Sequence, residues 1–105
     1  AANDIENSKR IFKEIIFSKN KFYSFLSLNT IIEKNLEENK EEVLKLFKVV
    51  EKTISEKEQK NLIKLKKALY IMKTSSNSLE AQKLLKEIIE DESSLSSLAL
   101  EISKK

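Results

Sequence analysis

The sequence predicts an all-α protein, and the amino acids that it lacks are the main reason. None of its 105 residues is Gly or Pro, whereas a typical chain of this length has about seven Gly and about five Pro. Hairpin turns need Gly where φ is positive and loops favour Pro, while both residues destabilise helices. The length suits one domain with a modest core. We therefore expect residues 1–105 to form a single compact bundle of about five or six short antiparallel helices.

Helix starts are predicted from capping patterns, because the Gly and Pro residues that usually mark helix boundaries are missing. Four sites place a side-chain acceptor three residues before a Glu, which is the spacing of a capping box or of its Asn analogue. These sites begin at Thr30, Asn39, Ser55 and Asn77. The last three precede regular apolar stripes, whereas Thr30 lies inside a longer apolar run and does not clearly begin a helix.

Apolar residues at helical spacing predict the first two helices. The stripe over residues 5–17 ends at the polar run 18–21, and a densely apolar stretch follows over residues 22–36. This stretch is apolar around more than one side, which indicates a central helix or a dimer interface.

The remaining helices are expected over residues 39–54, 55–73, 79–90 and 95–102. The pattern leaves open whether residues 39–73 form one helix or two, and we favour a break at 53–55 because Ser55 and Glu58 would form a cap there. The clearest loop is 74–78, since Ser, Thr and Asn side chains compete for backbone hydrogen bonds. A short break is expected at 91–94.

The expected core takes apolar side chains from every predicted helix. Its members are Ile15, Phe22, Leu26, Ile32, Leu44, Phe47, Val50, Leu65, Leu69, Leu85, Ile88 and Leu98. Five of the seven aromatic residues lie in the first 25 positions. Packing in the core is their simpler interpretation, and an exposed anchor for a partner, formed by Phe17 and Tyr23, is the functional one.

Charge alternates in blocks along the chain. Residues 9–21 carry a net charge of +4 and residues 33–42 carry −3, after which 57–73 carry +5 and 80–92 carry −3. This alternation predicts neighbouring helices whose surface charges complement one another.

The composition excludes most enzyme and cofactor chemistry. Without His and Cys, the usual general base, the thiolate nucleophile and the common zinc and haem ligands are missing. Without Gly, the phosphate-binding loops of nucleotide enzymes are excluded. The densest acidic cluster, formed by Glu87, Glu90, Asp91 and Glu92, is more simply a solvated helix face than a weak cation site. We expect no enzymatic activity, no cofactor and no metal site.

The basic segment 57–73 is the best candidate binding surface. We predict that a partner binds at Lys57, Lys60, Lys64, Lys67 and Tyr70. The expected partner is an unidentified protein, acidic in character, or an anionic glycan or membrane surface, and the simpler alternative is a solvated or internally paired helix face. Specific nucleic-acid binding is not expected, because only one of the 20 basic residues is Arg.

The composition and helix style of the sequence resemble those of the mature helical domains of surface lipoproteins from Lyme-type spirochaetes. The resemblance is carried by the Lys-, Ile-, Asn-, Glu- and Ser-rich composition, typical of an AT-rich bacterium, and by short amphipathic stretches such as 60–70 (KNLIKLKKALY). It implies a protein-binding module at the cell surface, anchored to the outer membrane through a lipidated Cys upstream of Ala1. The absence of an initiator Met agrees with a processed chain, and no apolar stretch approaches the roughly 18 residues that span a bilayer.

A second resemblance is to bacteriocin immunity proteins. The stretch 54–62 (ISEKEQKNL) is similar to an inter-helix corner in some of them. This alternative implies a cytoplasmic helical bundle. A homodimeric structural module is the third interpretation. All three describe a protein that works by binding.

Overall fold

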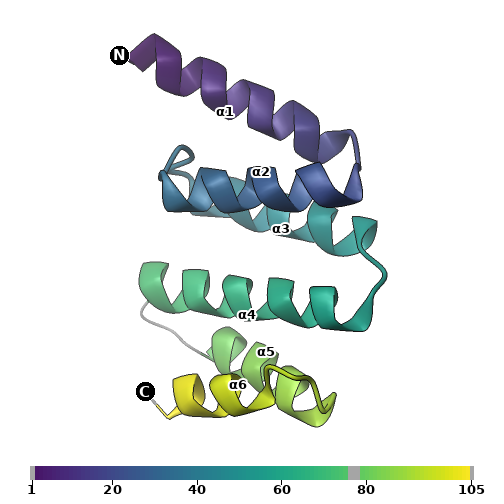
Figure 1. The fold of residues 1–105 in the computed structure, drawn as a ribbon. Coiled ribbons are helices and arrows are strands. Elements are labelled where there is room, and N and C mark those ends of the chain that lie inside the picture. Colours follow the sequence, from purple (N-terminus) through teal and green to yellow (C-terminus); the bar gives the residue numbers. More distant parts are fainter. Residues whose placement is uncertain (1, 76–78, 105) are drawn as a thin grey trace. The chain divides into compact units, whose positions relative to one another are not determined.

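The fold is all-α, as predicted. A computed structural model describes residues 2–75 and 79–104, and these residues form six helices and no strand (Figure 1). The helices are α1 (Ala2–Phe17), α2 (Lys21–Glu33), α3 (Lys40–Thr53), α4 (Lys57–Thr74), α5 (Leu79–Glu90) and α6 (Ser96–Ser103). Contacts group them into two compact units, residues 1–54 and 55–105. That all 105 residues form one domain stays a prediction.

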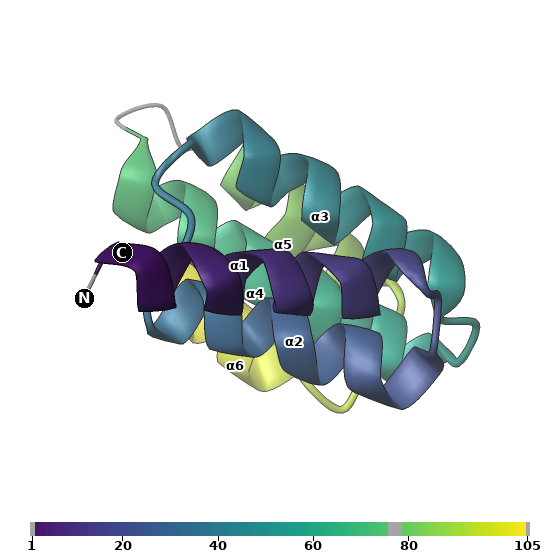
Figure 2. The ribbon, with the colours of Figure 1, turned by 90° about the horizontal axis from the view of Figure 1, so that it is seen from above.

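The first unit contains α1, α2 and α3. Helix α1 packs against both α2 and α3, and α2 also packs against α3. Seen from above, α1 runs alongside its two neighbours (Figure 2). The buried apolar side chains of this unit are Ile16, Leu28, Ile31, Val43, Leu46, Phe47, Val50 and Ile54.

The second unit contains α4, α5 and α6. Helix α5 is central, because it packs against α4 on one side and against α6 on the other. The buried apolar side chains are Ile63, Leu65, Ala68, Ile71, Ala81, Leu85, Ile88 and Ala99. None of the described helices combines the length and the apolar content that crossing a membrane requires.

The predicted break after residue 53 is confirmed, but the capping predictions have a mixed outcome. Asn39 caps α3, and its side-chain oxygen accepts a hydrogen bond from the Glu42 amide at 3.2 Å. Thr30 does not begin a helix, as its place in a longer apolar run indicated, since this residue lies within α2 and its hydroxyl donates to the Leu26 carbonyl. Such back-bonding satisfies the hydroxyl inside a helix and leaves no capping role.

The cap predicted at Ser55 is wrong. Helix α4 begins after Glu56, and Glu56 makes no side-chain capping hydrogen bond. The Glu58 side chain bonds elsewhere, as described below, so the predicted reciprocal pair does not form. Asn77 lies outside the described residues. A cap that the pattern missed is Asn20, whose side chain accepts a hydrogen bond from the Tyr23 amide at 2.9 Å.

Three turns show how a chain without Gly reverses after a helix. Lys19, Asn35 and Glu92 adopt left-handed backbone conformations, with φ of 62°, 51° and 52°. After α2 the Leu36 amide donates to the Ile31 carbonyl at 2.9 Å, which is the long bond of a Schellman motif. Gly usually occupies the left-handed position because other residues pay a steric cost there. The turn at 91–94 was predicted, and Glu92 makes it possible without Gly.

The predicted core is correct in part. Phe47, Val50, Leu65, Leu85 and Ile88 are buried, as expected, and Ile15, Ile32 and Leu44 are half-buried. Four predicted core residues are exposed instead, and these are Phe22, Leu26, Leu69 and Leu98. In each helix neighbouring residues take the inward positions, among them Leu28 in α2, Ala68 in α4 and Ala99 in α6.

Candidate functional site

Helix α2 buries small polar side chains and exposes large apolar ones. Ser24 is 0% exposed and Ser27 is 4% exposed, whereas Phe22 is 66% and Tyr23 is 57% exposed. This is the reverse of the usual distribution, in which Ser is mostly exposed and Phe is among the residues most often buried.

Ser24 joins α2 to α1. Its hydroxyl lies 3.1 Å from the Ile15 carbonyl oxygen and 3.2 Å from the Ile16 carbonyl oxygen, and it donates to this pair. A buried hydroxyl needs such an acceptor, because an unpaired one would cost free energy. The small side chain lets α2 approach the last turn of α1 closely, and Phe22, Tyr23 and Leu26 lie outside this contact and are exposed.

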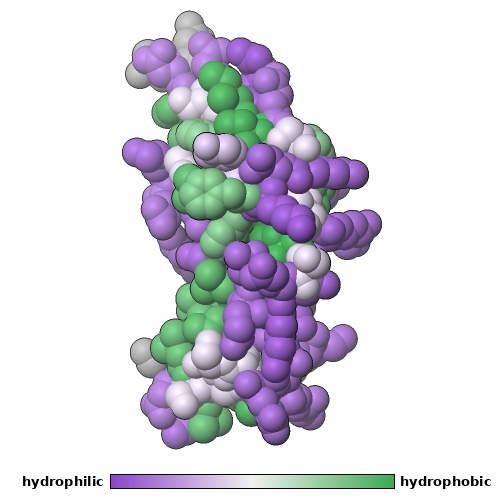
Figure 3. All heavy atoms as spheres, turned by 45° about the vertical axis from the view of Figure 1, so that its right-hand side comes forward, coloured by the Kyte–Doolittle hydropathy of each residue, from purple (hydrophilic) through white to green (hydrophobic). Residues whose placement is uncertain are grey.

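We call the exposed face of Phe22, Tyr23 and Leu26 the aromatic surface. Leu26 follows Phe22 by four positions and Tyr23 by three, so it neighbours both of them on the surface of α2. The rings of Phe22 and Tyr23 meet edge to face, with centroids 5.2 Å apart and planes at 77°. Apolar side chains reach the molecular surface in this unit, as the green areas in the upper part of Figure 3 show.

The sequence next to the aromatic surface carries positive charge. Lys19 and Lys21 precede it and are exposed, and no acidic residue occurs between Ser18 and Ile32. Phe17, at the end of α1, is 57% exposed as well. The core interpretation of Phe22 was therefore wrong, while the exposed alternative for Phe17 and Tyr23 agrees with the structure.

The sequence contained a signal for the orientation of α2. Ser24, Ser27, Leu28 and Ile31 are the buried residues of this helix, and their spacing of three, four and seven positions is that of one helix face. Counting only large apolar residues conceals this stripe, since such residues surround α2 on all sides.

The five residues predicted to bind a partner lie along α4 but differ in their surroundings. Lys57 and Lys60 are exposed, and Lys67 and Tyr70 are half-buried. The Lys64 ammonium lies 3.4 Å from a carboxylate oxygen of Glu87 in α5. The internally paired alternative therefore holds for Lys64, and the binding role of the five residues stays a prediction.

The acidic cluster at the end of α5 takes part in packing. Besides the pair formed by Glu87, Asp91 accepts a hydrogen bond from the Asn61 side-chain amide at 2.7 Å. Asn61 is 1% exposed, so Asp91 satisfies a buried donor of α4. Within residues 2–75 and 79–104, no cluster of three or more Asp or Glu side chains is placed to hold a metal ion.

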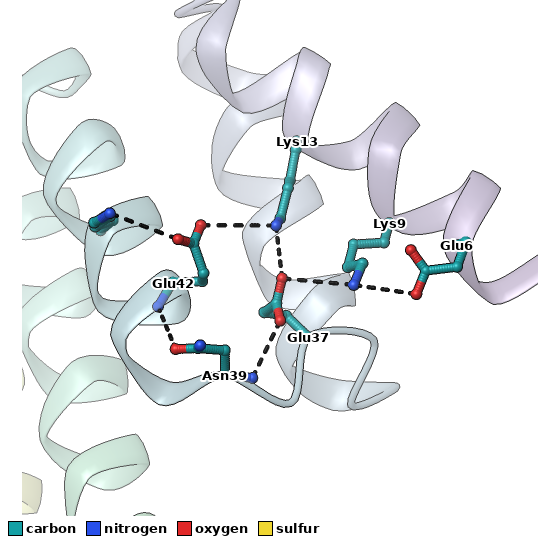
Figure 4. A network of polar contacts seen from close by, with 7 residues as sticks. Glu6, Lys9, Lys13, Glu37, Asn39 and Glu42 are labelled. Carbon is teal, nitrogen blue, oxygen red and sulfur yellow. Dashed lines mark hydrogen bonds and ion pairs between the residues drawn. The ribbon is translucent and has the colours of Figure 1, made fainter.

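A buried carboxylate links α1 to the turn between α2 and α3 (Figure 4). Glu37 is 8% exposed, and its Oε1 lies 2.6 Å from the Lys13 ammonium and 3.8 Å from that of Lys9. Its Oε2 accepts a hydrogen bond from the Asn39 amide at 3.1 Å. The basic block 9–21 thus meets the acidic block 33–42, as the charge pattern predicted.

The pKa of Glu37 is lowered by this network. Burial by itself raises the pKa of a carboxyl group, but the hydrogen bonds from Lys13 and Asn39 and the positive charges of Lys13 and Lys9 more than offset burial. The pKa of Lys9 is raised, chiefly by its hydrogen bond with Glu6 and against the effect of burial. Both groups are therefore charged at neutral pH, and the network acts as a structural tie.

The second unit has a tie of its own at Glu58. This carboxylate accepts a hydrogen bond from the Ser93 hydroxyl at 2.5 Å and another from the Ser94 amide at 2.8 Å. These hydrogen bonds, the one from Ser93 first, lower the pKa of Glu58 to about 2. Glu58 thereby holds the turn before α6 against the first turn of α4.

Comparisons with known proteins give no relative of this chain. No protein-family model matches it, and no match is found among curated proteins or among solved structures. Function is therefore inferred from the surfaces of the two units themselves.

Proposed function

We propose that this chain is a non-enzymatic binding module that docks a partner protein on the aromatic surface of α2. The observation that supports this proposal is that α2 buries Ser24 and exposes Phe22 and Tyr23. Burying a large apolar side chain stabilises a fold by about 1.5–3 kcal/mol, so folding alone favours the opposite arrangement. Clustered exposed aromatic residues are instead typical of surfaces that another protein covers.

The proposed partner presents an apolar patch with an acidic rim. Phe22, Tyr23 and Leu26 would supply the apolar centre of the interface. Lys19 and Lys21 are exposed beside them, and no carboxylate of the neighbouring sequence neutralises this edge. Complementary charges at an interface rim raise the association rate and exclude partners of the wrong sign.

The proposed location is the cell surface, with anchoring to the outer membrane by a lipid at the N-terminus. This proposal rests on the resemblance in composition and helix style. Mass spectrometry of the protein from its native cells tests it. A lipid-modified Cys upstream of Ala1 would support the location, and an unmodified chain beginning with Met would contradict it and favour the cytoplasmic alternative.

The docking proposal is tested by comparing two pairs of alanine substitutions. The immobilised chain is used to isolate its partner from host fluids and native cells, and the purified partner is then titrated in solution. Phe22→Ala with Tyr23→Ala is expected to weaken binding by at least about a hundredfold, since each hot-spot residue contributes about 2 kcal/mol or more. The matched control is Leu98→Ala with Leu100→Ala, because both leucines are about half exposed in α6.

Three results would contradict the docking proposal. One is an equal loss of affinity in the leucine control. The second is that Lys57→Glu with Lys60→Glu lowers the affinity while the aromatic substitutions do not, which would place the binding site on α4. The third is that no protein binds to the chain while anionic vesicles do.

A further inference from the structure

A shallow groove in the first unit combines apolar lining side chains with three lysines. It is lined by Phe17 of α1 and by Lys45, Lys48, Val49 and Lys52 of α3, and its volume is about 270 Å³. We call it the lysine groove. None of its lining residues is acidic.

The three lysines of the groove are aligned along α3. Lys48 and Lys52 follow Lys45 by three and seven positions, so they lie on one side of the helix over about 10 Å. Val49 is half-buried, and Phe17 is the lining residue that α1 contributes. A ligand in the groove therefore meets both apolar carbon and ammonium groups.

These lysines are not neutralised as the lysines of α1 are. Lys48 and Lys52 have no ion-pair partner among the described residues. Lys45 lies 3.6 Å from Glu42, but a pair so exposed contributes little. Lys48 and Lys52 are four positions apart, where like charges destabilise a helix. A bound anion would relieve this repulsion.

We propose that the lysine groove binds an acidic peptide segment of another protein. One apolar side chain of the segment packs against Phe17 and Val49, and carboxylates on either side of it pair with Lys45, Lys48 and Lys52. The site is separate from the aromatic surface and does not rest on the function proposed for that surface.

The size and shape of the groove favour a peptide over other anions. Pockets for small molecules usually enclose about 300–1,000 Å³, and the lysine groove is smaller and open. It therefore suits a single side chain with a backbone lying across the opening. The flat surface of a lipid bilayer would meet the ammonium groups but would not enter a concave site.

The experiment follows amide shifts of the ¹⁵N-labelled full chain during titration with three synthetic peptides. The first has one central Leu between runs of Glu, the second replaces this Leu with Ser, and the third replaces each Glu with Lys. The first peptide is expected to shift the amides of Phe17 and of residues 45–52. The Ser peptide should bind more weakly and the Lys peptide should not bind.

Two charge-reversed variants distinguish a specific site from general attraction. Lys48→Glu with Lys52→Glu is expected to weaken binding of the Leu peptide by about tenfold or more. Lys83→Glu with Lys86→Glu makes the same change in charge at exposed lysines of α5, and it should change affinity by less than about twofold. Circular dichroism checks that both variants remain helical.

Several results would overturn the lysine groove as a peptide site. Shifts that centre on α4, or equal losses in both variants, would show general electrostatic attraction. Equal binding of the Leu and Ser peptides would remove the apolar subsite. Binding of anionic vesicles that needs Lys48 and Lys52, without binding of the peptide, would replace the peptide with a membrane surface.

Discussion

The two units hold their turns with carboxylates in opposite environments. Glu37 is buried in the first unit and is neutralised by the ammonium groups of Lys13 and Lys9. Glu58 in the second unit is exposed and is held by the Ser93 hydroxyl and the Ser94 amide. Breaking a buried ion pair is costly, because the charge that remains is shielded from water and has no partner. The first unit should therefore be the more sensitive to loss of its carboxylate.

Each unit uses part of its positive charge internally. In the second unit Lys64 of the basic helix α4 pairs with Glu87 of the acidic helix α5. In the first unit the acidic turn pairs with the lysines of α1, while Lys48 and Lys52 of α3 have no such partner among the described residues. Exposed lysines occur in α4 as well, so it is the aromatic surface of α2 and the apolar lining beside Lys48 that assign both proposed binding surfaces to the first unit.

Of the two carboxylates, removing the buried one has the larger expected effect. Glu37→Gln keeps the shape of the side chain but removes its charge, which leaves Lys13 and Lys9 facing a neutral group. We expect the free energy of unfolding to fall by about 2–3 kcal/mol, measured by urea denaturation at neutral pH.

Glu38→Gln is the matched control, since Glu38 is the exposed neighbour of Glu37. Its effect should stay within about 0.5 kcal/mol. Equal small effects of the two substitutions would show that the buried network adds nothing, and the contrast between the units would then disappear.

A smaller effect is expected from Glu58, and it depends on pH. Because the folded-state pKa of Glu58 is lowered from 4.5 to about 2, its contribution is complete above pH 4.5 and is lost as the pH falls toward 2. Urea denaturation of the wild-type chain and of Glu58→Gln should therefore give free energies of unfolding that converge over this interval. Glu37 is present in both proteins and largely cancels in the comparison. If the difference between the two free energies of unfolding does not change with pH, the hydrogen bonds of Glu58 do not hold the turn before α6 against α4.

Much of the fold could be predicted because local chemistry decides it. The absence of Gly and Pro indicates helices throughout, and Asn39 marks the start of α3 by the spacing to Glu42 alone. The break between α3 and α4 was also predictable from the pattern. The left-handed turn at Glu92 was located but not explained, since nothing in the sequence distinguishes this Glu from its acidic neighbours.

The candidate surfaces were harder to predict because they depend on which way a helix faces. Helix α2 is apolar on all sides, so its large apolar residues alone do not select an inward face, and the buried stripe is seen only when Ser24 and Ser27 are counted with it. The lysines of α3 and α4 have similar spacings in the sequence. Only the fold shows that Lys64 has a partner in α5 and that Lys48 borders an apolar groove.

In the proposed function, Phe22 and Tyr23 bind a partner and contribute little to the stability of the fold. The most direct test of this proposal is the free energy of unfolding of Phe22→Ala with Tyr23→Ala, set beside the buried control Phe47→Ala. The double substitution of the exposed aromatic pair should lower the free energy of unfolding by less than about 1 kcal/mol. Phe47→Ala, which truncates a buried side chain, should lower it by about 3–5 kcal/mol. A loss of several kcal/mol from the aromatic pair would assign both side chains to the core and contradict the proposed docking surface.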